Sequence, residues 1–314
     1  AKQRDIIAGN RPGSALPPAF LAHPVWKRLY DFCVLWADED STLHTNIHNI
    51  WLEFDIDGAP QDIPVPGIFF GSETIQRVDN PDDLAWVSEQ AVPMLTGKHL
   101  SDTVTATMID AIQALPDDAR VFQVGAMVNR DPAFVRLCIK DIAPDAILPY
   151  LARIGWRGNP DELQTLIRTL AGIVDHVDLD IDVSDTISAK IGLEAYFMPR
   201  ANPGHHDKWD DFFTYLMDNG MCLPEKRTAL HQFPGILNEQ DNRADYPKSL
   251  LAASGVMGRR YHSFIAHGIY HIKIVYQPGR ALEAKAYLWV EHTWLSREQL
   301  RVMREENTPA EYSD

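Results

Sequence analysis

The sequence contains little cysteine. Its three cysteines, Cys33, Cys138 and Cys222, lie far apart and form no CxxC pair. This excludes a disulfide framework, which needs several cysteines, and a zinc ribbon, which needs closely spaced pairs. We therefore expect a protein of the reducing cytoplasm.

Long apolar runs are also missing. No run approaches the roughly 20 residues of a membrane span, and the first residues of the chain lack the apolar core of a signal peptide. We expect a protein that neither crosses nor enters a membrane.

Positive charge is scarce. The 314 residues include 29 Lys and Arg against 44 Asp and Glu, which gives a formal net charge of −15. Proteins that bind nucleic acid or anionic lipid need a net positive surface. The composition therefore excludes nucleic acid and anionic lipid as the main partner. With 45% hydrophobic and 23% charged residues, the chain is nevertheless typical of globular proteins.

Several common motifs are absent. The sequence has no GxGxxG, no Walker loop and no GxSxG elbow, which excludes the usual dinucleotide, NTPase and serine-hydrolase sites. Between the two ends of the chain, proline and glycine fall singly or in pairs between periodic segments, as turn residues do, and no internal stretch has linker composition. We expect a single domain spanning residues 1–314, with loose ends at residues 1–15 and 305–314.

Strict alternation of apolar and polar residues predicts β-strands in several segments. We interpret them as four hairpins along the chain, the first of which is represented by one clear strand. The predicted strands are 49–57, 121–128 with a partner at 135–140, 177–183 with 188–198, and 269–277 with 282–290.

Helical spacing of apolar residues separates these strands. Leu21 to Trp36 and Leu163 to Ile173 form two such stripes, and Asn159-Pro160 is a typical helix start. Trp209 to Leu216 forms a third stripe, and Ser296 to Gln299 resembles a capping box.

Hairpins joined by helices favour an antiparallel sheet, because parallel strands need a crossover after each strand. The predicted fold class is therefore α+β. The apolar strand faces are expected to pack on helices. The polar faces fit either an open sheet with one wet side or a barrel with helices outside and a polar lumen.

The polar faces of the later strands carry cations despite the acidic composition. If the sheet closes, these side chains converge and could hold a diphosphate through several donors. Alternatively, each is a solvated cation paired with a carboxylate across a strand. The cations are Arg136, Lys140, Lys190, Lys273 and Lys285, with Tyr196 and Tyr287 beside them.

The αββα order, the triplet Lys285-Ala286-Tyr287 and the alternation of cations with aromatics resemble the ABBA-type (PT-barrel) prenyltransferases. The resemblance covers roughly residues 45–295 and implies an antiparallel β-barrel surrounded by a ring of α-helices, in repeated αββα units. The sequence departs from the family in two ways. It shows four clear hairpins where the family has five, and Leu137 follows Arg136 where the family has Lys or Tyr.

The resemblance also implies an activity: metal-independent transfer of an isoprenoid from dimethylallyl or geranyl diphosphate to an aromatic or heteroaromatic acceptor, free or in a peptide, without a cofactor. It implies Glu53 as the catalytic base and a cationic group that stabilises the leaving diphosphate. The residues that would bind the diphosphate are Arg136, Lys140, Lys190, Lys273, Lys285 and Tyr287. The pocket that shields the allylic cation and holds the acceptor comprises Trp51, Tyr196, Glu194 and Trp289.

Two other functions are kept open. The same sheet could serve a non-catalytic protein that binds a peptide or a small molecule. An iron site of the 2-oxoglutarate oxygenase type is the other, built from His176 and Asp178 with His267 or His271. Asp210-Asp211 is similar to the aspartate-rich motif of terpene synthases, but its helical context favours a place at a helix N-terminus.

Overall fold

The computed structural model describes residues 2–11, 13–55, 62–72, 75, 78, 80–130, 135–198, 208–240, 243–258, 261–296 and 298–299. The chain divides into two compact units. The N-terminal unit comprises Ala1–Ala195 and Ile274–Glu283, and the C-terminal unit comprises Tyr196–Lys273 and Ala284–Asp314. Whether the chain is a single domain stays a prediction. Within the N-terminal end that we expected to be loose, Lys2–Ile7 form helix α1, whereas residues 305–314 lie outside the described residues.

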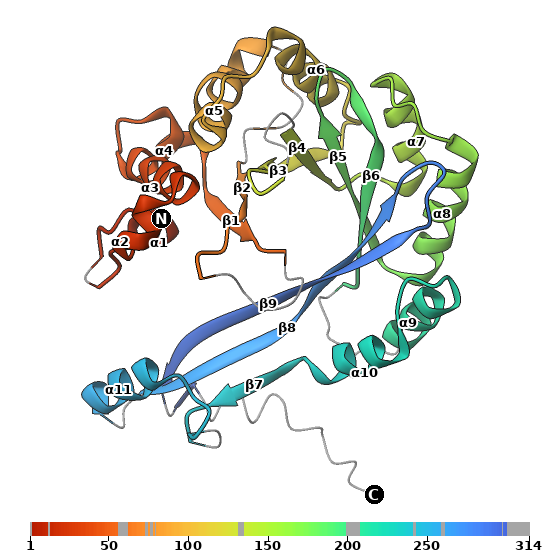
Figure 1. The fold of residues 1–314 in the computed structure, drawn as a ribbon. Helices are drawn as coiled ribbons and strands as arrows, with labels where there is room; N and C mark the ends of the chain where they lie inside the picture. Colours follow the sequence, from red (N-terminus) through yellow and green to blue (C-terminus); the bar gives the residue numbers. More distant parts are fainter. Residues whose placement is uncertain are drawn as a thin grey trace, which may run out of the picture. The chain divides into compact units, whose positions relative to one another are not determined.

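The structure combines an antiparallel sheet of nine strands with α-helices, which confirms the predicted α+β class. The hydrogen-bonded order is β1-β2-β3-β4-β5-β6-β8-β7, and β9 pairs with β8 (Figure 1). The strands are β1 Asn49–Glu53, β2 Gly67–Gly71, β3 Arg120–Ala126, β4 Val135–Lys140, β5 His176–Val183, β6 Ile187–Tyr196, β7 Gly235–Asn238, β8 Tyr261–Tyr276 and β9 Glu283–Ser296.

The prediction of a closed barrel is wrong, because the described strands form an open sheet. Their order is a path, and no ladder among them joins β1 to β7 or to β9. A helix, not a strand, contacts the backbone of β1 here. The Ile50 N–H donates to Oε1 of Gln3 in α1 at 3.1 Å. Covering an edge with a helix is one way to end a sheet.

The apolar face of the N-terminal unit's strands forms its core. Phe70 faces Val124, which faces Leu137, which faces Ile181 across successive strands, and all are buried. Phe32 of α3 packs on the Phe70 ring at 6.1 Å between centroids. Burying each such side chain contributes about 1.5–3 kcal/mol, so this face fixes which side of the sheet the helices cover.

Two helical stretches of the N-terminal unit were predicted, and helices occupy both. The stripe from Leu21 to Trp36 lies in two helices, and Asn159 caps a third by accepting from the N–H groups of Asp161 and Glu162. Besides α1 they are α2 Pro18–Ala22, α3 Pro24–Ala37, α4 Thr42–Asn46, α5 Val92–Thr96, α6 Asp102–Gln113, α7 Pro144–Arg153 and α8 Pro160–Ile173, with a 3-10 turn at Pro81–Leu84 and a π-helical turn at Trp86–Ala91.

The C-terminal unit contains α9 Lys208–Asp218, α10 Pro224–Gln232, α11 Lys248–Met257, the strand β7 and most of the strands β8 and β9. Its aromatic core joins Phe197 to Trp209 of α9, with ring centroids 4.9 Å apart. Ser296 and Gln299 exchange the two hydrogen bonds of the predicted capping box. In the described part of the chain, no helix has the length and apolar character needed to span a membrane.

Candidate functional site

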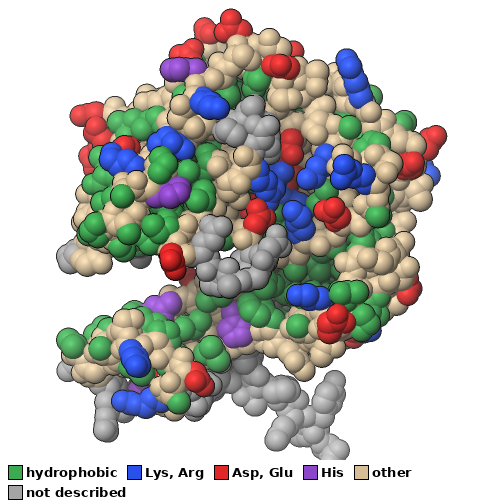
Figure 2. Space-filling view, viewed as in Figure 1, with side chains coloured by type: hydrophobic (Ala, Val, Ile, Leu, Met, Phe, Trp, Pro, Cys, Tyr) green, Lys and Arg blue, Asp and Glu red, His purple; other side chains and the backbone are tan. Residues whose placement is uncertain are grey.

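One row of side chains crosses the polar face of the N-terminal unit's sheet. The register places Trp51 opposite Phe69, Phe69 opposite Gly125, Gly125 opposite Arg136, and Arg136 opposite Asp182. Side chains directly opposite one another lie on the same face, so five strands bring two predicted site residues, Trp51 and Arg136, onto one surface. Figure 2 shows Lys and Arg side chains gathered over these strands, with Asp and Glu side chains among them.

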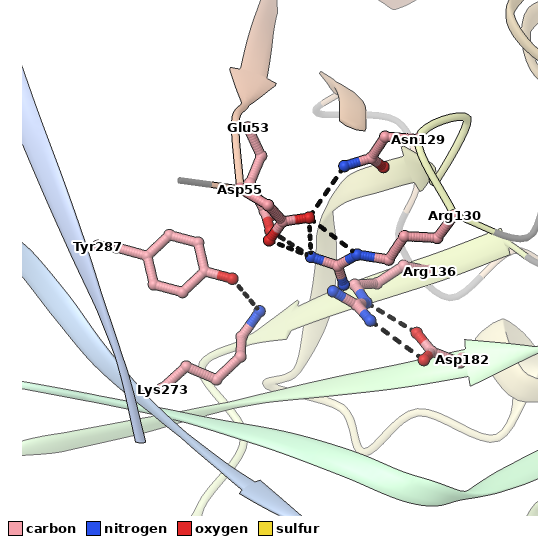
Figure 3. Close-up of polar contacts among 8 residues, drawn as sticks. All are labelled: Glu53, Asp55, Asn129, Arg130, Arg136, Asp182, Lys273 and Tyr287. Atoms are coloured by element: carbon pink, nitrogen blue, oxygen red, sulfur yellow. Dashed lines mark hydrogen bonds and ion pairs between the residues drawn. The ribbon is translucent and has the colours of Figure 1, made fainter. Parts of the chain in front are cut away.

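Arg136 is buried and bound to a carboxylate. Its Nε and Nη2 donate to the two carboxylate oxygens of Asp182 at 2.7 and 3.1 Å (Figure 3). Burial lowers the pKa of the Arg136 guanidinium, but the charge and hydrogen bonds of Asp182, together with Asp180, outweigh it and raise that pKa above its ordinary value. Bidentate pairs of this kind are among the stronger polar contacts in proteins, so the Asp182 carboxylate largely balances the charge of Arg136.

Arg130 holds the predicted base, Glu53. Its Nη2 donates to Oε1 of Glu53 at 3.2 Å and to Oδ1 of Asp55 at 2.6 Å, while Asn129 donates to Oδ2 of Asp55 at 3.0 Å (Figure 3). Burial lowers the pKa of Arg130, and the contacts with Asp55 and Glu53 more than reverse that effect. Neither Arg130 nor Asp55 was predicted as a site residue. Arg130 lies in the turn after β3, where no alternation marks it, and Asp55 lies two residues after the end of β1.

Lys140 lies against an aromatic ring. The β3–β4 register shifts between Val121 and Gln123, so Phe122 occupies a bulge, and the Lys140 Nζ lies 4.0 Å from the centre of its ring. This is a cation–π distance. Phe122 in turn packs against a small apolar cluster on the polar face, formed by Phe69, Met127 and Cys138.

Gly125 makes room for that cluster. A Cβ atom built on Gly125 would lie 2.5 Å from Cε1 of Phe69, a separation that real side chains do not tolerate. The ring of Phe69 therefore lies directly over the backbone of β3. A larger residue at this position would push the ring out of the row.

In the C-terminal unit, a second polar group lies on β8 and β9. The Lys273 Nζ donates to the Tyr287 hydroxyl at 3.2 Å and lies 4.9 Å from the centre of the Tyr287 ring (Figure 3). Lys273 is only 4% exposed. The ring of His271 stacks on Tyr287, with centroids 4.3 Å apart. A buried ammonium and a phenol are thus held together on neighbouring strands.

The predicted site residues fall into two sets, one in each unit. Glu194 and Tyr196 are buried on β6, whereas Lys190, Lys285 and Trp289 are partly exposed. The N-terminal set is Trp51, Glu53, Arg136, Lys140, Lys190 and Glu194, and the C-terminal set is Tyr196, Lys273, Lys285, Tyr287 and Trp289.

The alternative metal sites find no support in the described residues, which contain no group of three or more His, Cys, Asp or Glu able to hold a metal ion. Asp210 instead links two helices, accepting from Arg227 at 2.9 Å and contacting His231 at 3.0 Å. The hydrogen bonds from Arg227 and then His231 lower the pKa of Asp210. Of the two neighbouring residues predicted as iron ligands, His176 is exposed and Asp178 is buried.

Comparison of the chain with protein-family models gave no match, and neither curated proteins nor solved structures showed a significant similarity to it.

Proposed function

We propose that the protein is a metal-independent transferase that moves an isoprenoid from dimethylallyl or geranyl diphosphate to an aromatic or heteroaromatic acceptor, a small molecule or a peptide side chain. The observation that carries the proposal is the pair formed by Lys273 and Tyr287, a buried ammonium 3.2 Å from a phenol oxygen. Two donors held this close can both reach one diphosphate oxygen. Preorganised donors of this kind stabilise a departing anion.

The N-terminal unit supplies the features that an acceptor requires. Trp51 is 44% exposed, and Glu53 lies two residues further along β1. Residues two apart on a strand share a face, so an aromatic acceptor stacked on Trp51 would lie beside the Glu53 carboxylate. The repeated order of helices and hairpins is consistent with the αββα arrangement of the family that the sequence resembles.

The proposed reaction has three coupled changes. The bond between the isoprenoid carbon and its diphosphate oxygen breaks, that carbon bonds to the acceptor, and the acceptor proton passes to a carboxylate base, the role that the resemblance implies for Glu53. Within the C-terminal unit, Lys273, Lys285 and Tyr287 would stabilise the diphosphate as it leaves. Arg130 would hold the Glu53 carboxylate through its contact with Oε1.

A non-catalytic binding protein is the second candidate, and a specific observation favours it. Arg136 is bound to Asp182, and Arg130 is bound to Asp55 and Glu53. Cations already paired with carboxylates attract an anion less strongly, because the existing pairs must be weakened first. Such a face suits an uncharged aromatic ligand stacked on Trp51.

Thermal unfolding with ligands separates the two functions. We expect dimethylallyl or geranyl diphosphate, in the presence of a chelator, to stabilise the protein by about 2.7 kcal/mol at 100 times its Kd. Lys273→Ala should abolish the shift, whereas the exposed Lys226→Ala is the matched control. Mass spectrometry with tryptophan-containing acceptors then tests transfer. The absence of a shift with either diphosphate contradicts the proposal, and a shift with aromatic compounds alone supports the binding protein.

A further inference from the structure

The last strand, β9, has an edge that no other described strand occupies. It spans 14 residues, Glu283–Ser296, whereas strands in globular proteins usually have five or six. Among the described residues it pairs with β8 alone. None of its side chains is buried, so each face of the strand is at least partly exposed.

The edge lacks the features that usually prevent strand addition. Proteins protect edge strands with proline, bulges, short length or several lysines. The segment Ala284–Ser296 contains no proline and a single lysine, Lys285. Leu288 and Val290 are 48% and 67% exposed and lie on one face, two residues apart.

We propose that β9 of one molecule pairs antiparallel with β9 of a second copy, around a two-fold axis that passes through Leu288 perpendicular to the sheet. The interface shares Lys285, Tyr287 and Trp289 with the residues that we predict for the transferase site, but its argument and its test concern association of two chains and do not depend on transfer. In a symmetric interface each contact occurs twice. The register places Leu288 opposite itself, Ala286 opposite Val290, Tyr287 opposite Trp289 and Lys285 opposite Glu291.

Charge complementarity identifies the second copy as the partner and fixes the register. With Leu288 on the axis, Lys285 faces Glu291 at both ends of the interface, and opposite charges facing across strands are favourable. Placing the axis at Tyr287 instead sets Glu283 opposite Glu291, which is repulsive. Placing it at Trp289 sets Lys285 opposite Thr293, and the ion pair is lost.

The apolar residues support the same register. Ala286, Leu288 and Val290 from both copies would form a continuous apolar stripe on one face of the joined sheet. On the other face, Tyr287 and Trp289 would form two aromatic cross-strand pairs, which stabilise antiparallel sheets. A strand without a single buried side chain would thereby gain a partner along its edge.

Sedimentation velocity of the full chain tests the proposal. We expect a dimer whose dissociation constant rises on the order of tenfold in K285E and in E291K, because each reversal replaces two opposite-charge pairs by two like-charge pairs. The double variant K285E/E291K restores both pairs and should dimerise as the wild type does. Circular dichroism of each variant verifies that the fold is retained.

Disulfide trapping gives a second, independent readout. In a Cys222→Ser background, L288C should cross-link two chains under mild oxidation, because the two substituted positions face each other within the 4.4–6.8 Å that a disulfide requires. A286C is the control, because its two copies would be offset by four residues, about 13 Å along the strands. A chain that stays monomeric, a dimer unaffected by the charge reversals, or equal cross-linking of both cysteine variants would overturn the proposal.

Discussion

Arg136 and Asp182 face each other directly across β4 and β5 and share two hydrogen bonds of 2.7 and 3.1 Å. Their side chains are 7% and 15% exposed, so solvent screens the pair little. Arg136, which we predicted from the sequence as a diphosphate ligand, is therefore also a structural cation. Its removal would disturb the sheet before it disturbed any ligand.

We expect Arg136→Met to reduce the free energy of unfolding by about 3 kcal/mol, because it removes both hydrogen bonds and the counter-charge that Arg136 supplies to Asp182. The double variant with Asp182→Leu should lose less than the single one. Urea unfolding measures both, and a double-mutant cycle isolates the coupling.

An exposed pair in the same unit provides the control for that experiment. Arg120 and Asp141 form an ion pair with side chains 47% and 49% exposed. Removing it with Arg120→Ala should change the free energy of unfolding by less than about 1 kcal/mol. Equal losses from the two arginine substitutions would contradict the importance of burial.

Gly125→Ala should destabilise the protein by about 1–3 kcal/mol, because the new methyl group overlaps the ring of Phe69. A second substitution, Phe69→Leu, should recover part of the loss by removing the ring edge. Gly172→Ala in α8 is the matched control, since no atom lies within 4 Å of its added Cβ. That variant should be neutral or stabilised by up to about 1 kcal/mol.

Tyr276 should make stability fall at alkaline pH. Burial raises its pKa to about 12, with a smaller effect of its hydrogen bond to Glu162. The native state therefore binds this proton more tightly than the unfolded state, whose tyrosine has a pKa near 10. The corresponding stabilisation is complete below pH 10 and is lost as the pH rises to 12.

The measurement is urea unfolding of the wild type and Tyr276→Phe between pH 8 and about 12. The variant should show a weaker decline of stability above pH 10, along with a constant loss of about 1 kcal/mol from the missing hydrogen bond. Parallel pH profiles for the two proteins would show that another group controls the alkaline transition.

Thiol labelling should distinguish the three cysteines. Cys33 and Cys138 are buried, and burial raises the pKa of Cys33 to about 12, whereas Cys222 is partly exposed. Because the thiolate is the reactive form, we expect one slowly reacting thiol in the native protein and three in denaturant. Cys222→Ser should abolish the native reaction. Labelling of Cys33 at a similar rate would contradict the packing of α3.

The sequence predicted the strands with strict alternation but missed β2. All five residues of β2, Gly67–Gly71, are buried. Phe70 lies in the main core while Phe69 joins the small cluster with Met127 and Cys138 on the opposite face. A strand that is apolar on both faces has no period of two, so the pattern used for the other strands gave no signal.

The cations on the strands were predicted, but not their partners. Arg136 and Asp182 are 46 positions apart, and only the β4–β5 register brings them opposite each other. Arg130 reaches Glu53 and Asp55 from a turn more than 70 positions away. The Ile50 amide on β1 likewise finds its partner far away in the sequence, in the side chain of Gln3. Contacts between distant segments determine these features, and local periodicity does not encode them.

The hydrogen bond from the Ile50 amide to the Gln3 side chain has a consequence for hydrogen exchange. An edge amide normally exchanges its hydrogen with solvent freely, but this one is protected while α1 remains docked. Deuterium uptake at Ile50 would therefore report the detachment of the first helix, separately from any opening of the sheet. A single amide thus records the local stability of the N-terminal segment.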